Sequence, residues 1–265
     1  MSPQARKRFG QHFLHDPGVV RHIVTAFAAK PSDVVAEIGP GPGVLTRALA
    51  GHVHTLHAVE IDRDLAAERI AEFAHDPSVE IHTGDALDFD FCALTRSPQE
   101  LRVIGNLPYN ISTPLLFHLL DQAVCIRDML FMLQKEVVER MVAVPGGRDY
   151  GRLSVMVQWR CQVERLFVVG PGAFRPPPRV DSAVVRLQPY VQLPIAVKQP
   201  RWFARIVREA FSHRRKTLRN ALSALLPADA IEQLELDGGR RPETLSVAEF
   251  AALANSTAAP ESLDR

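Results

Sequence analysis

The sequence predicts two parts, a doubly wound α/β sheet followed by a small all-helical domain. Between residues 34 and 144, short apolar runs rich in Val, Ile and Leu alternate with helix-like segments, which is typical of a mostly parallel sheet. A glycine-rich turn at residues 39–43 joins the first of these runs to the helix-like segment after it. Beyond residue 200, apolar and basic residues recur at helical spacing, which predicts the second part.

Local signals place each element in turn. Asp16 is suited to cap a helix and Pro17 to its first position, so we expect a helix from there to about Ala29. The first part then continues as strand 34–39, helix 44–50, strand 55–60, helix 63–74, strands 79–83 and 102–106, helix 113–122, strand 129–134 and helix 135–144. After a loop at 145–147, the β-like runs are 152–160, 163–169 and 182–188, which would extend the sheet with antiparallel strands.

A domain boundary is expected near residue 190. The stretch 189–200 begins and ends with proline and is typical of a linker. We therefore expect a first domain of residues 1–189, which includes a basic N-terminal arm at 1–15 with Arg6, Lys7 and Arg8. Residues 190–265 would form the helical domain.

The composition bounds the classes of protein that are possible. With 265 residues, of which 46% are hydrophobic, the chain can bury a substantial core. It shows no secretory signal pattern and no run of 18 apolar residues, so a cytoplasmic protein away from the membrane is expected. Cys92, Cys125 and Cys161 are odd in number and far apart, so we expect core thiols rather than a disulfide framework. The ten histidines show no ligand pattern, and no metal site is expected.

The most informative motif lies at the end of the strand expected at 102–106. The side-chain oxygen of Asn106 and the carbonyl of Leu107 can both accept hydrogen bonds from one amino group. Pro108 stiffens the turn, and Tyr109 offers an aromatic face on which a base can stack. These residues predict a site for chemistry on the exocyclic amine of adenine. Taken alone, they could equally be a turn after a buried strand.

A second motif supplies a nucleotide pocket. Gly39, Gly41 and Gly43 allow the backbone to pass close to a ligand, and their G-x-G-x-G spacing differs from the G-x-G-x-x-G of dinucleotide binding. Glu60 ends the next strand, where it could accept from a ribose diol, and Asp85 follows the third, where it could accept from an adenine amino group. Because these strand ends share one edge of the sheet, they predict a pocket for S-adenosylmethionine (SAM).

With further segments, these motifs make the chain resemble the small-subunit (16S) rRNA adenine N6-dimethyltransferases, whose loss gives kasugamycin resistance in bacteria. The likeness runs from about residue 8 to residue 255. The segments that carry it are Gln11-His12-Phe13-Leu14, Glu37-Ile38-Gly39-Pro40-Gly41, Glu60, Gly84-Asp85, Asn106-Leu107-Pro108-Tyr109-Asn110-Ile111-Ser112, Phe131-Met132-Leu133-Gln134-Lys135-Glu136, Tyr150-Gly151-Arg152-Leu153-Ser154, Phe174-Arg175-Pro176-Pro177-Pro178, Val180-Asp181-Ser182-Ala183-Val184 and Arg214-Arg215-Lys216-Thr217-Leu218-Arg219-Asn220.

The resemblance implies a Rossmann-like, SAM-dependent methyltransferase domain. It also implies dimethylation of two adjacent adenosines in the 3′-terminal hairpin loop of 16S rRNA, within a nearly assembled 30S subunit, and a role in late subunit biogenesis. The product of the cofactor would be S-adenosylhomocysteine. We expect the enzyme to act as a monomer. No strong general base is needed, because the methylated amine is very acidic.

The resemblance also implies the residues of the site. The cofactor contacts are expected from His12, Leu14, Gly39, Gly41, Glu60, Ile61, Asp85, Ala86 and Asn106. The family usually has Asn where this chain has His12, which puts that contact in doubt. Asn106, Leu107, Pro108 and Tyr109 would hold the target base, and Phe174 would be its second stacking face, fixed by the prolines at 176–178. A core aromatic is the alternative for Phe174.

The charge distribution points to nucleic acid. The net charge is only +1, yet residues 198–219 contain eight Lys or Arg and one acid, Glu209. If helical phase is kept, five of the arginines share one arc opposite an apolar stripe. The residues expected to bind RNA are Arg201, Arg205, Arg208, Arg214, Arg215, Lys216 and Arg219.

Several alternatives remain open. The antibiotic-resistance enzymes that methylate one adenine of large-subunit rRNA share the glycine loop, but the block at 214–220 favours the small-subunit branch. A ribosome-assembly factor that has lost its chemistry is the non-enzymatic alternative, and the intact Gly39, Glu60, Asp85, Asn106 and Tyr109 argue against it. A DNA adenine methyltransferase and a NAD-dependent enzyme fit less well, the first for want of a target-recognition segment and the second because of its glycine spacing.

Overall fold

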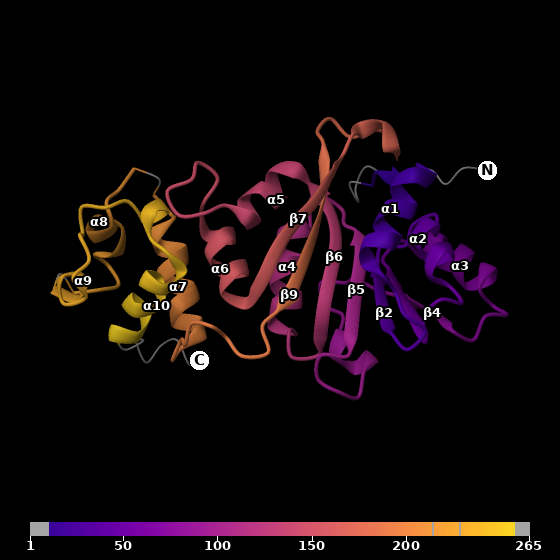
Figure 1. Ribbon diagram of the computed structural model, residues 1–265, viewed down its shortest axis with the longest axis horizontal. Coiled ribbons are helices and arrows are strands. Elements are labelled where there is room, and N and C mark those ends of the chain that lie inside the picture. The colour runs from indigo at the N-terminus through magenta and orange to yellow at the C-terminus, as the bar shows by residue number, and fades with distance from the viewer. Residues whose placement is uncertain (1–10, 214, 228, 258–265) are drawn as a thin grey trace. The chain divides into compact units, whose positions relative to one another are not determined.

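The computed structural model describes residues 11–213, 215–227 and 229–257 (Figure 1). It contains two compact units. The first comprises the chain up to Val138 together with Gln162–Pro189, and the second comprises Glu139–Cys161 together with the chain from Tyr190 onward. The second unit thus includes residues 139–161, which the sequence assigns to the first domain. Arg6, Lys7 and Arg8 of the expected basic arm lie outside the described residues.

The first unit is built on a seven-stranded sheet in the order β4-β3-β2-β5-β6-β9-β7. Its strands are β2 (Val34–Ile38), β3 (Thr55–Glu60), β4 (Val79–Thr83), β5 (Leu101–Asn106), β6 (Ile126–Gln134), β7 (Cys161–Val169) and β9 (Ser182–Pro189). The pairs from β4 to β6 are parallel, and β9 runs antiparallel to β6. The chain moves outward from β2 to β4 and then returns to the other side of β2 with β5, which makes the ends of β2 and β5 a topological switch point. The predicted doubly wound sheet is confirmed.

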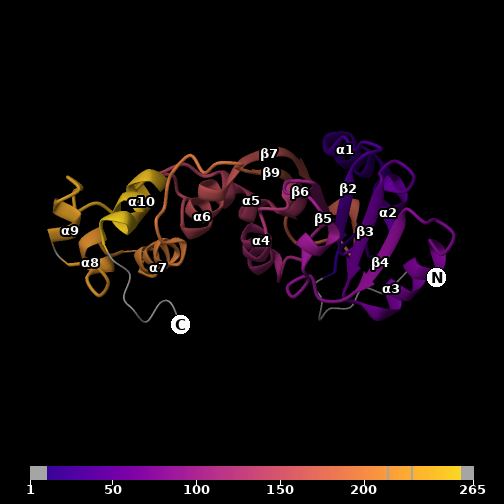
Figure 2. The same cartoon turned by 90° about the horizontal axis from the view of Figure 1, so that it is seen from below.

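Helices cover this sheet, and a short second sheet lies beside it. The helices are α1 (Pro17–Phe27), α2 (Val44–Leu49), α3 (Arg63–Glu72) and α4 (Ser112–Asp121), with 3-10 turns η2 (Phe91–Leu94) and η3 (Pro171–Ala173). Helix α5 (Lys135–Val142) begins in the first unit and ends in the second. The Asp16 carboxylate accepts a hydrogen bond from the Val19 amide at 2.9 Å, which confirms the expected helix cap. The small sheet pairs β1 (Phe13–Leu14) with β8 (Phe174–Arg175). Figure 2 shows β2, β3 and β4 side by side.

The second unit is helical, as expected, but two of its details correct the sequence-based prediction. Its elements are α6 (Arg152–Arg160), α7 (Pro200–Ala210), α8 (Leu218–Leu222), α9 (Asp229–Glu232), η4 (Pro242–Thr244) and α10 (Val247–Ser256). The run 152–160 is a helix and not the predicted strand. The Gly151 amide donates to the Ser154 hydroxyl at 3.0 Å in its first turn, and a short apolar run fits a buried helix as well as a strand.

The second correction concerns helical phase. Helix α7 ends at Ala210, a turn follows, and α8 begins only at Leu218. The prediction of a continuous basic stripe from residue 201 to residue 219 is therefore wrong, because the turn between the two helices changes the direction of the side chains.

Among the described helices, none is long and apolar enough to cross a membrane.

The cysteines are also a correction. Cys92 and Cys125 are joined in a disulfide with a Cα–Cα distance of 5.4 Å, where the sequence predicts free thiols. The Gln122 side-chain oxygen accepts from the Phe91 amide at 2.7 Å, and this contact brings η2 next to the residues that precede β6. A separation of 33 residues gave no local signal for the pair. Cys161 is free and buried, and burial raises the pKa of its thiol to about 12.

Candidate active site

A cavity lies at the carboxyl ends of β2, β3, β4 and β5, around the switch point of the sheet. Its walls come from the glycine loop, from the residues after β3 and β4, from the turn after β5 and from the segment at 11–13. Of the predicted cofactor and base-binding residues, those that line it are His12, Gly39, Gly41, Glu60, Ile61, Asp85, Ala86, Asn106, Leu107, Pro108 and Tyr109. The fold thus brings two motifs that are far apart in sequence into one site.

The glycine loop adopts backbone angles that favour glycine. Gly39, Gly41 and Gly43 all have positive φ, at 68°, 53° and 81°, a region that other residues rarely occupy. The Glu60 carboxylate accepts from the Gly41 amide at 3.0 Å and from the Asp62 amide at 2.9 Å. Glu60 is only 3% exposed, and burial raises the pKa of its carboxyl above the ordinary value. Glu60 therefore fixes the loop and still presents an acceptor to the cavity.

A second buried acid, Glu37, lies beneath the loop. It sits in β2, and the Thr46 hydroxyl at the start of the next helix donates to its Oε2 at 2.7 Å. Burial raises the pKa of Glu37 to about 7, and the nearby charge of Glu60 adds to the effect. We did not predict a role for Glu37 from the residues, although an acid in an otherwise apolar strand was a signal for one.

The residues after β3 and β4 form one wall of the cavity. Ile61 is 42% exposed although it lines a cavity, which leaves an apolar surface for a flat ring to cover. The Asp85 carboxylate accepts from the Leu87 amide at 2.9 Å, which orients the side chain on its loop. With Ala86 beside it, this wall combines apolar contact with a polar acceptor, as nucleotide sites require.

The turn after β5 is held rigidly. A Cβ atom on Gly105 would lie 2.7 Å from the carbonyl oxygen of Ile38, so only glycine lets β5 approach β2 here. The side-chain amide nitrogen of Asn106 donates to the backbone carbonyl of His12 at 2.8 Å. The side-chain oxygen of Asn106, Oδ1, is left as an acceptor. The Leu107 amide donates to the carbonyl of Met132 at 3.1 Å.

Tyr109 is anchored at its far end. Its hydroxyl is 2.7 Å from Oγ of Ser182, a fully buried residue of β9, and burial raises the pKa of the phenol. The ring of His12 lies 5.4 Å from the Tyr109 ring, centroid to centroid. His12 in turn donates from Nδ1 to the carbonyl of Pro176 at 2.8 Å. His12 therefore lines the cavity beside Tyr109.

Two predicted residues lie elsewhere. Leu14 and Phe174 are register partners in the β1–β8 pair, and both are 2% exposed within the hydrophobic core. Phe174 does not line the cavity, and its role as the second stacking face stays a prediction. The side chains of a strand alternate, and here the pairing turns Phe174 inward while Arg175 is exposed. The side chain of Leu14 also packs into the core, so only its main chain is left for a cofactor contact, and Phe13 lines the cavity instead.

The predicted RNA-binding residues are divided among three elements. Arg201, Arg205 and Arg208 recur at one face of α7, with the Arg205 guanidinium 5.9 Å from the Trp202 ring. Arg215 and Lys216 are exposed in the following turn. Arg219 belongs to α8 and forms an ion pair with Glu232 at 2.7 Å. Arg214 lies outside the described residues.

One basic neighbour was missed from the sequence. The positive charge of Arg208 helps to lower the pKa of Arg152, after the larger effect of burial. Arg152 is the first residue of α6, so the basic residues of the second unit come from two helices that are distant in sequence. In the sequence, Arg152 lies in the Tyr150-to-Ser154 segment, which is one of those that carry the resemblance.

Comparison with known proteins identifies the family of the chain. Residues 2–259 match the family described as "Ribosomal RNA adenine dimethylase". The chain belongs to this family. It is 58% identical to Ribosomal RNA small subunit methyltransferase A of Pseudomonas syringae pv. tomato, over 96% of this chain and 94% of that protein. It is 55% identical to the protein of the same name from Pseudomonas aeruginosa, over 96% and 95% of the two chains.

Solved structures agree as well. A dimethyladenosine transferase from Plasmodium falciparum superposes with a TM-score of 0.76 at 28% identity, and covers 91% of this chain and 96% of its own. The 23S rRNA methyltransferase ErmE superposes with a TM-score of 0.70 and covers 92% of this chain and 98% of its own. At 24% identity, the likeness to ErmE establishes the fold alone.

Proposed function

We propose that this protein is a SAM-dependent enzyme that dimethylates N6 of two adjacent adenosines near the 3′ end of 16S rRNA. The observation that carries the proposal is the meeting of the glycine loop and the Asn106–Tyr109 turn in one cavity, in a chain that belongs to the rRNA adenine dimethylase family. The small subunit is supported as the substrate by relatives at 55–58% identity that are named for it.

The residues present fit SAM. The exposed apolar surface of Ile61 suits the adenine ring, and Asp85 lies where an exocyclic amine would need an acceptor. Glu60 would accept from the ribose hydroxyls. The buried carboxyls of Glu37 and Glu60 bring negative charge to this end of the sheet when they are ionised, which suits a positively charged ligand.

The turn after β5 would prepare the adenine amine for attack. SAM supplies an electrophilic methyl group next to a sulfonium. Asn106 Oδ1 and the carbonyl of Leu107 accept from the amino hydrogens of N6 and turn its lone pair toward the methyl carbon. As the N–C bond forms and the C–S bond breaks, positive charge develops on N6, and the same two acceptors stabilise it more than they stabilise the ground state. The N6 proton then leaves to solvent.

The second methylation would depend on stacking. After the first transfer only one N–H remains, so the Asn106 side chain and the Leu107 carbonyl can no longer both be satisfied by the amine. Tyr109 then has to hold the ring by its face, and its hydroxyl bond to Ser182 keeps that face in place. The basic residues Arg201, Arg205, Arg208, Arg215 and Lys216 would bind rRNA phosphates.

The test is transfer of labelled methyl from SAM to small subunits isolated from a strain that lacks the modification. Naked 16S rRNA and large subunits are assayed in parallel. We expect up to four methyls per small subunit, mapped to two neighbouring adenosines. Asn106→Ala should reduce kcat/KM by about 30- to 1,000-fold, equivalent to about 2–4 kcal/mol. Gln162→Ala, an exposed residue on β7, serves as the control that should leave the rate unchanged.

Other results would favour the alternatives. Label on large subunits would indicate a resistance-type enzyme, which the ErmE-like fold leaves structurally possible. Tight binding to small subunits without any label would indicate an assembly factor. Near-full activity of Asn106→Ala would exclude the base-binding role of this residue.

A further inference from the structure

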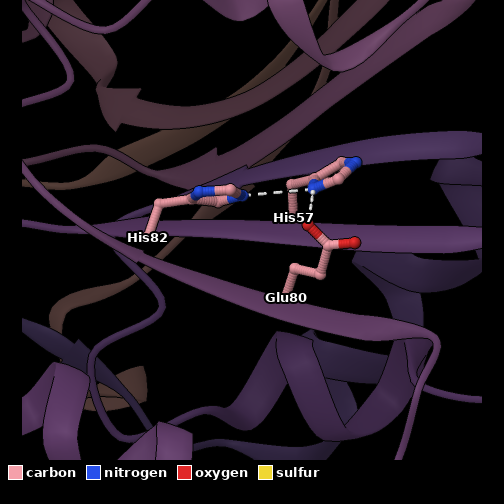
Figure 3. A group of neighbouring side chains, drawn as sticks. All are labelled: His57, Glu80 and His82. Atoms are coloured by element: carbon pink, nitrogen blue, oxygen red, sulfur yellow. Dashed lines mark hydrogen bonds and ion pairs between the residues drawn. The ribbon is translucent and has the colours of Figure 1, made fainter.

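A cluster of metal-ligating side chains lies on the sheet away from the cavity contacts described above. His57 is in β3, and Glu80 and His82 are two residues apart in the neighbouring strand β4. His57 and Glu80 are register partners, so all three side chains project from the same face of the sheet. Figure 3 shows the two imidazoles and the carboxylate facing one another. Each offers one ligand atom, and the three atoms lie within 4.8 Å of one another.

Two of the three ligand-atom distances are close to those that a zinc ion imposes, and the third lies within 4.8 Å. Nδ1 of His57 lies 3.1 Å from Nε2 of His82 and 3.4 Å from Oε2 of Glu80. Metal–ligand bonds of about 2.0–2.2 Å in a tetrahedron place neighbouring ligand atoms about 3.3–3.6 Å apart. An ion can therefore enter with small side-chain rotations and without movement of the strands.

The chemical state of the ligands is also suitable. Burial lowers the pKa of His57 and of His82, and in each case outweighs the opposing effect of the Glu80 charge. Neutral imidazole nitrogen is the form that binds a metal. The ring of His82 is held by an edge-to-face contact with Phe89 at 5.3 Å between centroids. The Glu80 side chain is 57% exposed, so solvent can reach the site and water can complete the coordination.

We propose that His57, Glu80 and His82 form a binding site for Zn²⁺ with two imidazoles, one carboxylate and one open position. Two nitrogen donors and one oxygen favour zinc over Mg²⁺ or Ca²⁺, which take oxygen ligands. The ion would link β4, an edge strand of the described sheet, to β3. Its ligands His57 and His82 each lie three residues before a residue that lines the cavity, Glu60 and Asp85 respectively. The site was missed from the sequence because its ligands come from two strands and show no compact spacing.

The test uses untagged full-length protein freed of metal with EDTA. Zn²⁺ is added and binding is measured by calorimetry, and Co²⁺ is added separately to detect the visible absorption of tetrahedral cobalt. We expect one equivalent of Zn²⁺ per chain, a rise in melting temperature on zinc addition, and no binding of Mg²⁺ at the same concentration. The assay contains neither SAM nor RNA, so its failure would leave the proposed methyl transfer untouched.

Matched variants decide the ligand assignment. Glu80→Gln and His82→Gln should each weaken zinc binding by about 100-fold or more, because losing even a group that only orients a ligand costs about 10–100-fold. These residues are less buried than His57, so their variants should keep the fold. His52→Gln, at an exposed histidine before β3, should bind zinc like the parent. Absence of stoichiometric binding, or binding that survives both variants, would overturn the proposal.

Discussion

The buried acids Asp33, at one end of the parallel sheet, and Glu37, at the other, have pKa values that are shifted in opposite directions. At the amino ends of the strands, Arg102 bonds Asp128 through two nitrogens at 2.7 Å and Asp33 through a third at 2.7 Å. Burial alone would raise the pKa of Asp33, but the hydrogen bonds from Arg127 and Arg102 outweigh it and leave the pKa below its ordinary value. At the carboxyl ends, burial raises the pKa of both Glu37 and Glu60.

We attribute this difference to a division of roles within one sheet, in which the amino end contributes to stability and the carboxyl end to function. Asp33 and Glu37 are four residues apart, one just before β2 and the other inside it. Asp33 forms ion pairs with two arginines, whereas Glu37 accepts from the Thr46 hydroxyl and feels only the more distant charge of Arg47. The amino end is neutralised within the protein. At the carboxyl end burial outweighs the charge of Arg47 at Glu37, and the charge that Glu37 and Glu60 carry when ionised stabilises a cationic ligand when one binds.

The largest expected effect is at the neutralised end. Arg102→Met leaves Asp33 and Asp128 buried without their main cation, which should lower the free energy of unfolding by about 3–5 kcal/mol. Urea denaturation at neutral pH measures it. Arg127→Met is the control, because that side chain is 44% exposed and its loss should cost only about 1 kcal/mol. Equal losses in the two variants would contradict the contrast between the ends of the sheet.

The second effect is at Glu37 and depends on pH. A carboxyl with pKa 4.5 in the unfolded chain and about 7 in the folded protein binds more protons when folded, so stability falls as pH rises from about 4.5 to about 7 and stays low above that. Glu37→Gln removes this loss and should stabilise the protein at pH 8 by up to about 3 kcal/mol, with little change at pH 4.5. Urea denaturation at both pH values measures the difference from the parent. Glu68→Gln, at an exposed side chain, is the control, and a difference independent of pH would refute the assignment.

A third, smaller effect concerns cofactor binding. Glu60→Gln keeps the shape of the side chain but removes its charge, and should weaken SAM binding by about 2 kcal/mol, or about 30-fold. Because ribose is common to SAM and S-adenosylhomocysteine, calorimetry should show a loss for both, and a larger one for SAM because its sulfonium is also attracted by the Glu60 charge. A loss confined to SAM would place Glu60 beside the sulfonium instead of the ribose.

The smallest effect is at Tyr109. Ser182→Ala removes the partner of the Tyr109 hydroxyl and should cost about 1 kcal/mol in the second methylation, so that monomethyladenosine accumulates. Mass spectrometry of digested rRNA gives the ratio of mono- to dimethyladenosine. In Ser182→Ala with Tyr109→Phe, both partners of the bond are gone, and the loss should be no larger than in Ser182→Ala alone. An unchanged ratio in all variants would show that the anchor has no part in the second step.

Local signals in the sequence predicted most of the sheet and the centre of the site. The alternation of apolar runs located strands β2 to β6, and Asp16 with Pro17 marked the start of α1. Gly39, Gly41 and Asn106 carry their roles in backbone conformation or side-chain chemistry, so they could be identified without a structure. Their common location followed from one rule, that the carboxyl ends of parallel strands meet at a switch point.

Features that depend on long-range contacts could not be predicted in this way. Val155 and Trp159 suit a strand or a buried helix equally, and the packing of α6 decided between them. Phe174 became a core residue because β8 pairs with β1, more than 150 residues away. The Cys92–Cys125 bond and the His57, Glu80 and His82 cluster join residues from separate elements.

The sequence by itself determined the order of the elements, the glycine loop and the chemical identity of the residues around the target amine. Each of these depends on spacing or conformation within a few residues. Only the tertiary structure decided which acids are neutralised, which aromatic rings are exposed and where the basic helix ends. The pKa of a carboxyl or the burial of a ring depends on groups brought from distant parts of the chain, and Glu37 and Asp33 differ for that reason alone.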